Sequence, residues 1–384
     1  MDDVSEPHRP ALPDLDGLVN QPFRRPAAQV RSAEVSRPLR IGYLPADVIP
    51  RVIQAGRGRR WVALALTTLI ATGCNSGQAV TNPATGPARE INTLWWAMFA
   101  GAMVVFAAVL VLLVLAFVRR HRDDASDGDR GPYMVIVGGG LAAPIVLLAI
   151  LFGFVIHVMS ATSAPTPGTT RLTVDVIGHQ WFWEVRYPGT TAVTANEIHI
   201  PADTPVDVRA TTVDVIHSFW VPRLNRKIDM IPGRVNQVEL DAADPGVYRG
   251  QCSEFCGVGH AEMAFDVIVQ PASAFRSWLA GQARPATPPA GAQATSGQHI
   301  FMTAGCEDCH TIRGTTASGR VGPDLTHLGS RRTLAALTIP NTPRDLFSWI
   351  TNPQRVKPGA EMPGFASLPA AERRALVVYL ESLR

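Results

Sequence analysis

Residues 252–263 read C-S-E-F-C-G-V-G-H-A-E-M and place two thiols, an imidazole and a thioether in one short loop. A further histidine lies upstream in the run D-V-I-H-S-F-W. Thiolate, thioether and imidazole are the ligands that copper prefers, whereas a closed structural zinc site rarely includes a methionine. The stretch therefore predicts a copper centre. Its candidate ligands are His217, Cys252, Cys256, His260 and Met263.

The two cysteines of this loop have a second interpretation. In an oxidising compartment a C-x3-C pair can form a disulfide. A disulfide gives no reason for a histidine and a methionine at fixed places shortly after the second cysteine. The spacing of His260 and Met263 therefore favours a metal over a disulfide.

A second redox motif follows in the C-terminal part of the chain. The segment Cys306-Glu-Asp-Cys309-His310 has the C-x-x-C-H pattern that attaches haem c covalently. The C-x-x-C of a thioredoxin-like redox pair needs a βαβ context, which the surrounding sequence lacks. The chain is therefore expected to carry two redox centres of different kinds.

Composition restricts the remaining choices. A length of 384 residues and an uneven distribution of apolar residues indicate several modules. A net charge of +3 is small for this length and argues against a nucleic-acid partner or a polyanionic substrate. Four of the five cysteines belong to the two metal motifs, so we expect no disulfide framework.

Two long apolar runs predict a transmembrane helical hairpin over residues 91–160. The spans are expected at about 92–118 and 133–159, because a membrane helix needs about 20 apolar residues. The short connection between them holds several arginines, which the positive-inside rule places in the cytoplasm. Everything after Thr162 is then expected on the outer, periplasmic side of a bacterial inner membrane, where haem c is attached.

The N-terminal part has two expected segments. Residues 1–56 are polar and proline-rich without periodicity, which indicates a disordered leader or a mis-assigned translation start. Residues 57–74 resemble a lipoprotein signal, with a basic start, a short apolar run and small residues before Cys74. Cys74 is thus a candidate lipidation site; the alternative is an uncleaved anchor with an inert cysteine.

Residues 165–272 are predicted to form an all-β sandwich or barrel, because short segments rich in Val, Ile, Thr and Trp alternate with turns. Residues 273–295 are expected to form a short helix and an Ala/Pro linker, which reads as a semi-rigid tether. Residues 296–384 form a small helical domain around the C-x-x-C-H motif, ending in an amphipathic helix.

With these motifs in place, the chain resembles subunit II of a haem-copper cytochrome c oxidase, followed by a fused class I cytochrome c. The resemblance covers about residues 91–271 for the oxidase part. Beyond the copper loop it rests on G-H-Q-W-F-W (178–183), N-E-I-H-I-P (196–201), H-S-F-W-V-P (217–222), K-I-D (227–229) and P-G-R (232–234). It implies three folds: a two-helix hairpin, a cupredoxin-like Greek-key sandwich and an all-α cytochrome c domain.

The resemblance also implies roles at the copper site. In that family the site is a dinuclear centre, CuA, whose two cysteine sulfurs bridge the metals. Carried over, Cys252 and Cys256 bridge, while His217 and His260 each hold one copper. Met263 is a weak ligand and the backbone carbonyl of Glu254 completes the set. The Glu254 side chain is expected to face a magnesium ion shared with subunit I, since carboxylate oxygen suits that ion.

At the haem, the resemblance implies thioether bonds at Cys306 and Cys309, with His310 as the proximal ligand. Met362, in the run V-K-P-G-A-E-M-P, is expected to be the second axial ligand, with His327 as the alternative. Trp181 is in family terms the point at which an incoming electron arrives.

The implied function is an electron-transfer subunit of a cytochrome c oxidase. Haem c takes electrons from a cytochrome c or a membrane-bound donor and passes them through CuA to haem a of subunit I, where O2 is reduced to water with proton pumping. The alternative is a membrane-anchored copper-delivery or thiol-redox assembly protein. One departure from the family is Val137, which stands where many subunits II carry a glutamate for proton uptake.

Overall fold

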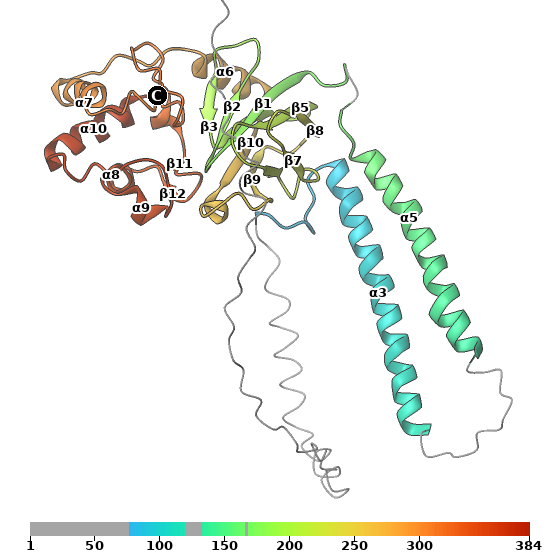
Figure 1. The fold of residues 1–384 in the computed structure, drawn as a ribbon. Helices are drawn as coiled ribbons and strands as arrows, with labels where there is room; N and C mark the ends of the chain where they lie inside the picture. The colour runs from blue at the N-terminus through green and yellow to red at the C-terminus, as the bar shows by residue number, and fades with distance from the viewer. Residues whose placement is uncertain (1–76, 120–132, 166–167) are drawn as a thin grey trace, which may run out of the picture. The chain divides into compact units, whose positions relative to one another are not determined.

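The computed structural model describes residues 77–119, 133–165 and 168–384 (Figure 1). The predictions for the leader, for the lipoprotein-like segment with Cys74 and for most of the connection between the two apolar runs lie outside these residues.

Two helices of the described chain are long and apolar enough to cross a membrane, over Gly86–Val118 and Ile136–Ala161. The first is α3, Gly86–Arg119, and the second continues into α5, Ala143–Ala161. They run alongside each other in Figure 1. Large apolar side chains are exposed all along both helices, which is the pattern of a helix that faces lipid rather than a protein core.

The second helix begins with a π-helical segment, η2, Val135–Ala142. Here the backbone N–H of Ala143 donates to the carbonyl of Gly138, five residues back. Pro144 follows, and in a regular α-helix its ring would meet the carbonyl of Gly140. A wider turn through three glycines gives the ring room, so the sequence explains the irregularity.

The middle domain is a sandwich of two five-stranded sheets. The first has the order β3-β2-β1-β5-β8, from β1 Leu172–His179, β2 Phe182–Arg186, β3 Val193–Ala195, β5 Val206–Thr212 and β8 Asn236–Leu240. The second has the order β4-β10-β9-β6-β7, from β4 Glu197–Pro201, β6 His217–Trp220, β7 Ile228–Met230, β9 Gly246–Cys252 and β10 Ala264–Gln270. Non-consecutive neighbours in each sheet give the expected Greek-key sandwich, which is confirmed.

The core of the sandwich is aromatic where it approaches the copper loop. Trp183, Phe219 and Phe265 are fully buried, and their rings contact one another. Gly250 allows this packing, since a Cβ there would lie 2.3 Å from the Phe265 ring. In the same sheet, β9 pairs with β6 through Cys252 and Phe219, and these two strands supply Cys252 and His217.

The C-terminal domain is helical, as predicted. Its helices are α7 Ala292–Thr303, α8 Pro343–Thr351, α9 Pro353–Val356 and α10 Ala370–Ser382, with a small ladder of β11 Thr333–Leu334 and β12 Ile339–Pro340. Helices α7 and α10 cross closely because Gly297 has no side chain; a Cβ there would lie 2.1 Å from the carbonyl oxygen of Ala375. Phe301 and Tyr379 then pack edge to face in the core.

The segment between the two domains differs from the expected tether. After α6, Ala272–Gln282, its backbone is bonded to the cytochrome-like domain. The Arg313 side chain donates to the carbonyls of Gln282 and Ala283, and the His327 ring bonds the carbonyl of Arg284. Composition indicated a semi-rigid tether, and these contacts hold its first part against the domain that follows.

Candidate metal centres

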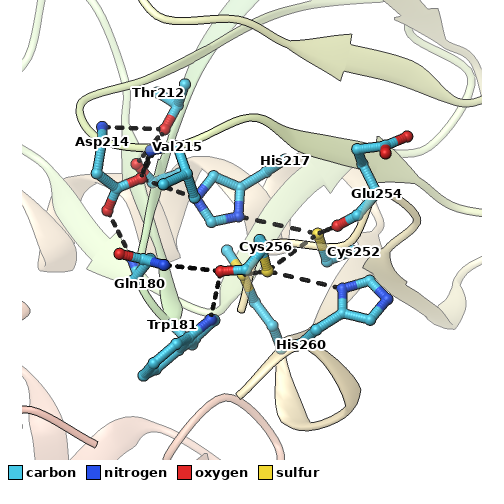
Figure 2. A network of polar contacts seen from close by, with 12 residues as sticks. Gln180, Trp181, Thr212, Asp214, Val215, His217, Cys252, Glu254, Cys256 and His260 are labelled. Carbon is cyan, nitrogen blue, oxygen red and sulfur yellow. Dashed lines mark hydrogen bonds and ion pairs between the residues drawn. The ribbon is translucent and has the colours of Figure 1, made fainter. Parts of the chain in front are cut away.

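The copper loop brings its soft ligand atoms together (Figure 2). The Sγ atoms of Cys252 and Cys256 lie 3.7 Å apart. Nδ1 of His217, from β6, lies 3.8 Å from Sγ of Cys252. Nδ1 of His260, in the short turn His260–Glu262 (η3), lies 3.6 Å from Sγ of Cys256. Each thiol thus faces the other thiol and one imidazole nitrogen.

These distances decide between the two interpretations of the cysteine pair. A disulfide requires sulfurs about 2.05 Å apart, and both cysteines are free. Metal bonds measure about 2.3 Å to sulfur and about 2.0 Å to imidazole nitrogen in zinc sites, so atoms on one small metal ion lie roughly 4 Å apart. The ligand atoms of His217, Cys252 and Cys256 lie within 4.8 Å of one another, and Nδ1 of His260 adds a second imidazole on the Cys256 side. The residues present fit a pair of bridged copper ions.

The two weaker ligands expected from the sequence also lie at the site. Sδ of Met263 is 3.8 Å from Sγ of Cys256, and the carbonyl oxygen of Glu254 is 3.1 Å from Sγ of Cys252. The Glu254 carboxylate points away from the sulfurs in Figure 2, and it is half exposed, 4.0 Å from Nζ of Lys227. Backbone and side chain of Glu254 therefore face different surroundings.

His217 is oriented by a carboxylate. Its Nε2 lies 2.9 Å from Oδ1 of Asp214, which leaves Nδ1 for the metal. Burial lowers the pKa of His217, but its bonds to Cys252 and Asp214 outweigh burial and raise the pKa above its usual value. Burial raises the pKa of Asp214, yet the His217 ring and the backbone N–H groups of Gln180 and Val215 hold it below its usual range. Asp214 is therefore a charged partner that fixes the imidazole.

The two thiols share their protons unequally. The hydrogen bond from Cys256 lowers the pKa of Cys252, and His217 lowers it further, against the effect of burial. The same hydrogen bond raises the pKa of Cys256, as does its burial. The first thiolate of the pair thus forms readily, and thiolate is the form that binds metal.

Trp181 lies flat on the copper loop. Its Nε1–H donates to the carbonyl oxygen of Cys256 at 3.0 Å, and the Gln180 amide donates to the same oxygen at 2.7 Å (Figure 2). Two glycines make this approach possible. A Cβ on Gly257 would lie 2.9 Å from the Trp181 indole, and a Cβ on Gly259 would lie 2.5 Å from it. The indole is therefore hydrogen-bonded to the backbone of Cys256, a candidate copper ligand.

A largely apolar cavity in the C-terminal domain gathers the expected haem residues. Cys306, Cys309, His310 and Met362 all line it. Nδ1 of His310 lies 2.8 Å from the carbonyl oxygen of Pro323, and since a carbonyl only accepts, Nε2 is left free to bind iron. Burial lowers the pKa of His310 and so favours the neutral ligand form. These residues fit a covalently attached haem.

The alternative axial ligand lies elsewhere. His327 is buried and its Nε2 is 3.0 Å from the carbonyl oxygen of Arg284; it does not line the cavity. Two other histidines have structural contacts: His179 stacks on Phe182, and His199 stacks on Trp278. The geometry therefore places Met362, and not His327, at the cavity.

Sequence reasoning missed Gln180, Asp214 and Lys357. Asp214 had a detectable signal, a carboxylate three residues before a candidate ligand. Gln180 and Lys357 lie within motifs that were recognised, Q-W and V-K-P-G, but their bonds join parts of the chain far apart in sequence. The Lys357 ammonium, for example, donates to the carbonyl of Trp181, 176 residues away.

Two family models match the chain. Residues 190–270 match the periplasmic domain of cytochrome c oxidase subunit II, and residues 294–384 match cytochrome c. The first of these descriptions implies copper of the CuA type and the second implies haem c, in agreement with the ligand sets above.

Individual relatives extend the match over most of the chain. Cytochrome c oxidase subunit 2 of Alkalihalophilus pseudofirmus is 31% identical over 338 residues, which cover 85% of this chain and 97% of the relative. The Bacillus subtilis subunit 2 is 29% identical, covering 63% of this chain and 72% of the relative. A solved periplasmic domain of subunit II from Bradyrhizobium japonicum is 33% identical over 31% of this chain and 96% of that domain, with a TM-score of 0.29. The chain belongs to the cytochrome c oxidase subunit 2 family, with an electron-transfer role in an oxidase and a cytochrome c domain at its C-terminal end.

Proposed function

We propose that this chain relays electrons from haem c, through Trp181, to a dinuclear copper centre and on to haem a of oxidase subunit I, where O2 is reduced to water with proton pumping. The donor to haem c is a cytochrome c or a membrane-bound protein. Each transfer moves one electron: haem c is oxidised, the copper pair is reduced, and no bond is made or broken.

One observation carries the proposal. The Trp181 indole bonds the carbonyl of Cys256 and also lines the cavity that contains His310 and Met362. A single side chain thus touches a copper ligand on one side and the haem cavity on the other. A copper-delivery protein has no use for a haem cavity that opens on its metal loop, so this contact favours electron transfer over assembly.

The ligand residues have distinct tasks in this relay. His217 and His260 would each supply one nitrogen, and Cys252 and Cys256 would supply their sulfurs. A copper pair held by these residues would spread the charge change of reduction over two ions, so that little rearrangement would accompany electron transfer. The bond from His217 to Asp214 would hold the imidazole in one orientation toward the metal.

The Glu254 side chain supports a second proposal, a magnesium ion held with subunit I. Its carboxylate is half exposed and is not used by the copper set. Hard carboxylate oxygen suits magnesium. Carboxylate and carbonyl of one residue would then link the copper centre to the partner subunit.

The arrangement in the membrane also belongs to the proposal. Helices α3 and α5 would form the two spans, with residues 165–272 as the copper domain and 296–384 as the cytochrome domain on the periplasmic side. The apolar surface of both helices supports this placement. Val137 lies in η2 and offers no carboxylate to a proton path.

Metal analysis and spectroscopy of the purified full chain test the function. We expect two copper ions and one covalent haem per chain, with the mixed-valence electron paramagnetic resonance signal of a dinuclear centre. A single-copper signal, or zinc in place of copper, would contradict the copper assignment. A chain that holds copper but releases it to an acceptor protein would favour the assembly role instead.

A further inference from the structure

Lys357 joins the cytochrome domain to the copper loop. Its Nζ donates to the carbonyl of Trp181 at 2.7 Å and to the carbonyl of Glu262 at 2.8 Å, both in the copper domain. Its third contact is the carbonyl of Ala335 in its own domain, at 3.3 Å. The residue is only 3% exposed. An ammonium has three donors, and here each has an acceptor, which is the condition for burying such a group.

The neighbouring backbone packs onto the same loop. Gly359 has φ +85°, and a Cβ there would lie 2.3 Å from Cγ2 of Val258 and 3.5 Å from the Trp181 ring. Val258 stands between the copper ligands Cys256 and His260. Glycine at 359 therefore serves both the turn and the close approach of the two domains.

A second connection fixes the other end of this contact. The backbone N–H of Arg332 donates to the Glu197 carboxylate at 2.7 Å, and the Arg332 guanidinium lies 3.6 Å from the carboxylate of Asp266. Glu197 and Asp266 are almost fully buried. Two separated connections define an orientation, whereas one would leave the cytochrome domain free to rotate.

We infer that Lys357 is a positioning residue that docks the cytochrome domain on the copper loop, so that the haem cavity opens on Trp181. The inference rests on the proposed function for its redox meaning. Because the cavity is walled by Trp181 and Gln180 as well as by the haem residues, the chain's own cytochrome domain occupies the face through which copper would be reached. An outside donor then has to deliver its electron to haem c and not to copper.

Lysine acetylation of the full chain in detergent tests the docking without any metal signal. Lys227, whose side chain is 52% exposed, is the internal reference. Burial lowers the pKa of Lys357 to about 8, which by itself makes the amine more reactive, so slow acetylation can only report occlusion. We expect Lys357 to react about ten-fold or more slowly than Lys227. Equal rates would overturn the docking.

Electron transfer from haem c to copper tests the role of the side chain in the intact oxidase. Lys357→Met keeps the length of the stem but removes the donors, and we expect transfer to slow about ten-fold, since bonds from a charged donor are the strong ones. The haem spectrum and the copper signal should stay unchanged. Arg355→Met is the matched control, because the side chain of this exposed residue donates to Ser348 of its own domain.

A wild-type rate in Lys357→Met, or an equal loss in Arg355→Met, would overturn the inference. Gly359→Ala is the second variant: it should wedge the domains apart, speed acetylation of Lys357 and slow transfer, with the haem spectrum retained. Failure of the proposed function is distinguishable, since a chain that lacks dinuclear copper but still protects Lys357 would contradict the relay while supporting the docking.

Discussion

The Nε1–H of Trp181 donates to the carbonyl oxygen of Cys256 at 3.0 Å, so an indole that lines the haem cavity is bonded directly to a residue of the copper loop. This contact depends on Gly257 and Gly259 of the C-G-V-G-H segment, because a side chain at either position would clash with the Trp181 ring. The bond connects the two redox sites in one domain arrangement.

Trp181→Phe removes this donor and shortens the ring. We expect slower electron transfer from haem c to copper, with an unchanged copper signal, because none of the metal ligands is altered. Flash-induced kinetics in the intact oxidase measure the rate. Trp278→Phe is the control, since Trp278 stacks on His199 at the edge of the sandwich. Equal slowing in both variants would contradict a specific role for Trp181.

Cys256→Ser replaces a soft sulfur by a hard oxygen at a position proposed to bridge the two copper ions. We expect the dinuclear centre to be lost and the copper content to fall to one ion or none. Elemental analysis and electron paramagnetic resonance give the content and the kind of centre. An intact mixed-valence signal in this variant would show that Cys256 does not bridge.

Asp214→Asn tests the positioning of His217. Carboxylates that orient a ligating histidine typically contribute about 10- to 100-fold in metal affinity, and we expect a loss of that size in copper retention against a chelator. Asp175→Asn is a matched control, since Asp175 of β1 pairs with Arg209 of the neighbouring strand β5. Unchanged retention in Asp214→Asn would mean that the loop alone orients the ring.

Met362→Leu and His327→Leu distinguish the two candidates for the second axial ligand. Only Met362 lines the haem cavity, while His327 bonds the carbonyl of Arg284. Loss of a methionine ligand should lower the haem potential and open the sixth position. Redox titration and the absorption spectrum detect both changes. If His327→Leu gives them and Met362→Leu does not, the assignment is wrong.

Much of the fold followed from local patterns. The short Val-, Ile- and Thr-rich segments of residues 165–272 predicted a β domain, because half-buried strands need that composition. The strands β3, β6 and β7 have only three or four residues each and offer too short a pattern to recognise. The apolar runs predicted both long helices, but the π-helical start of the second needed the combination of Gly138–Gly140 with Pro144.

The residues of the candidate site also differ in how far the sequence alone could predict them. The candidate copper and haem ligands could be proposed from the sequence because their chemistry and spacing are carried by short motifs. The partners Asp214 and Lys357 act through contacts that only folding creates, and the fixed first part of the linker depends on Arg313 and His327 donating to its carbonyls. Composition describes a segment's own flexibility and not what the rest of the chain bonds to it.

Rapid reduction of haem c in the intact oxidase, followed at haem and copper wavelengths together, tests the proposed relay. We expect haem c to be reduced first and its reoxidation to coincide with reduction of the copper pair. The relay would be contradicted if the copper pair became reduced without any reoxidation of haem c. It would also be contradicted if an outside donor reduced the copper pair without passing through haem c.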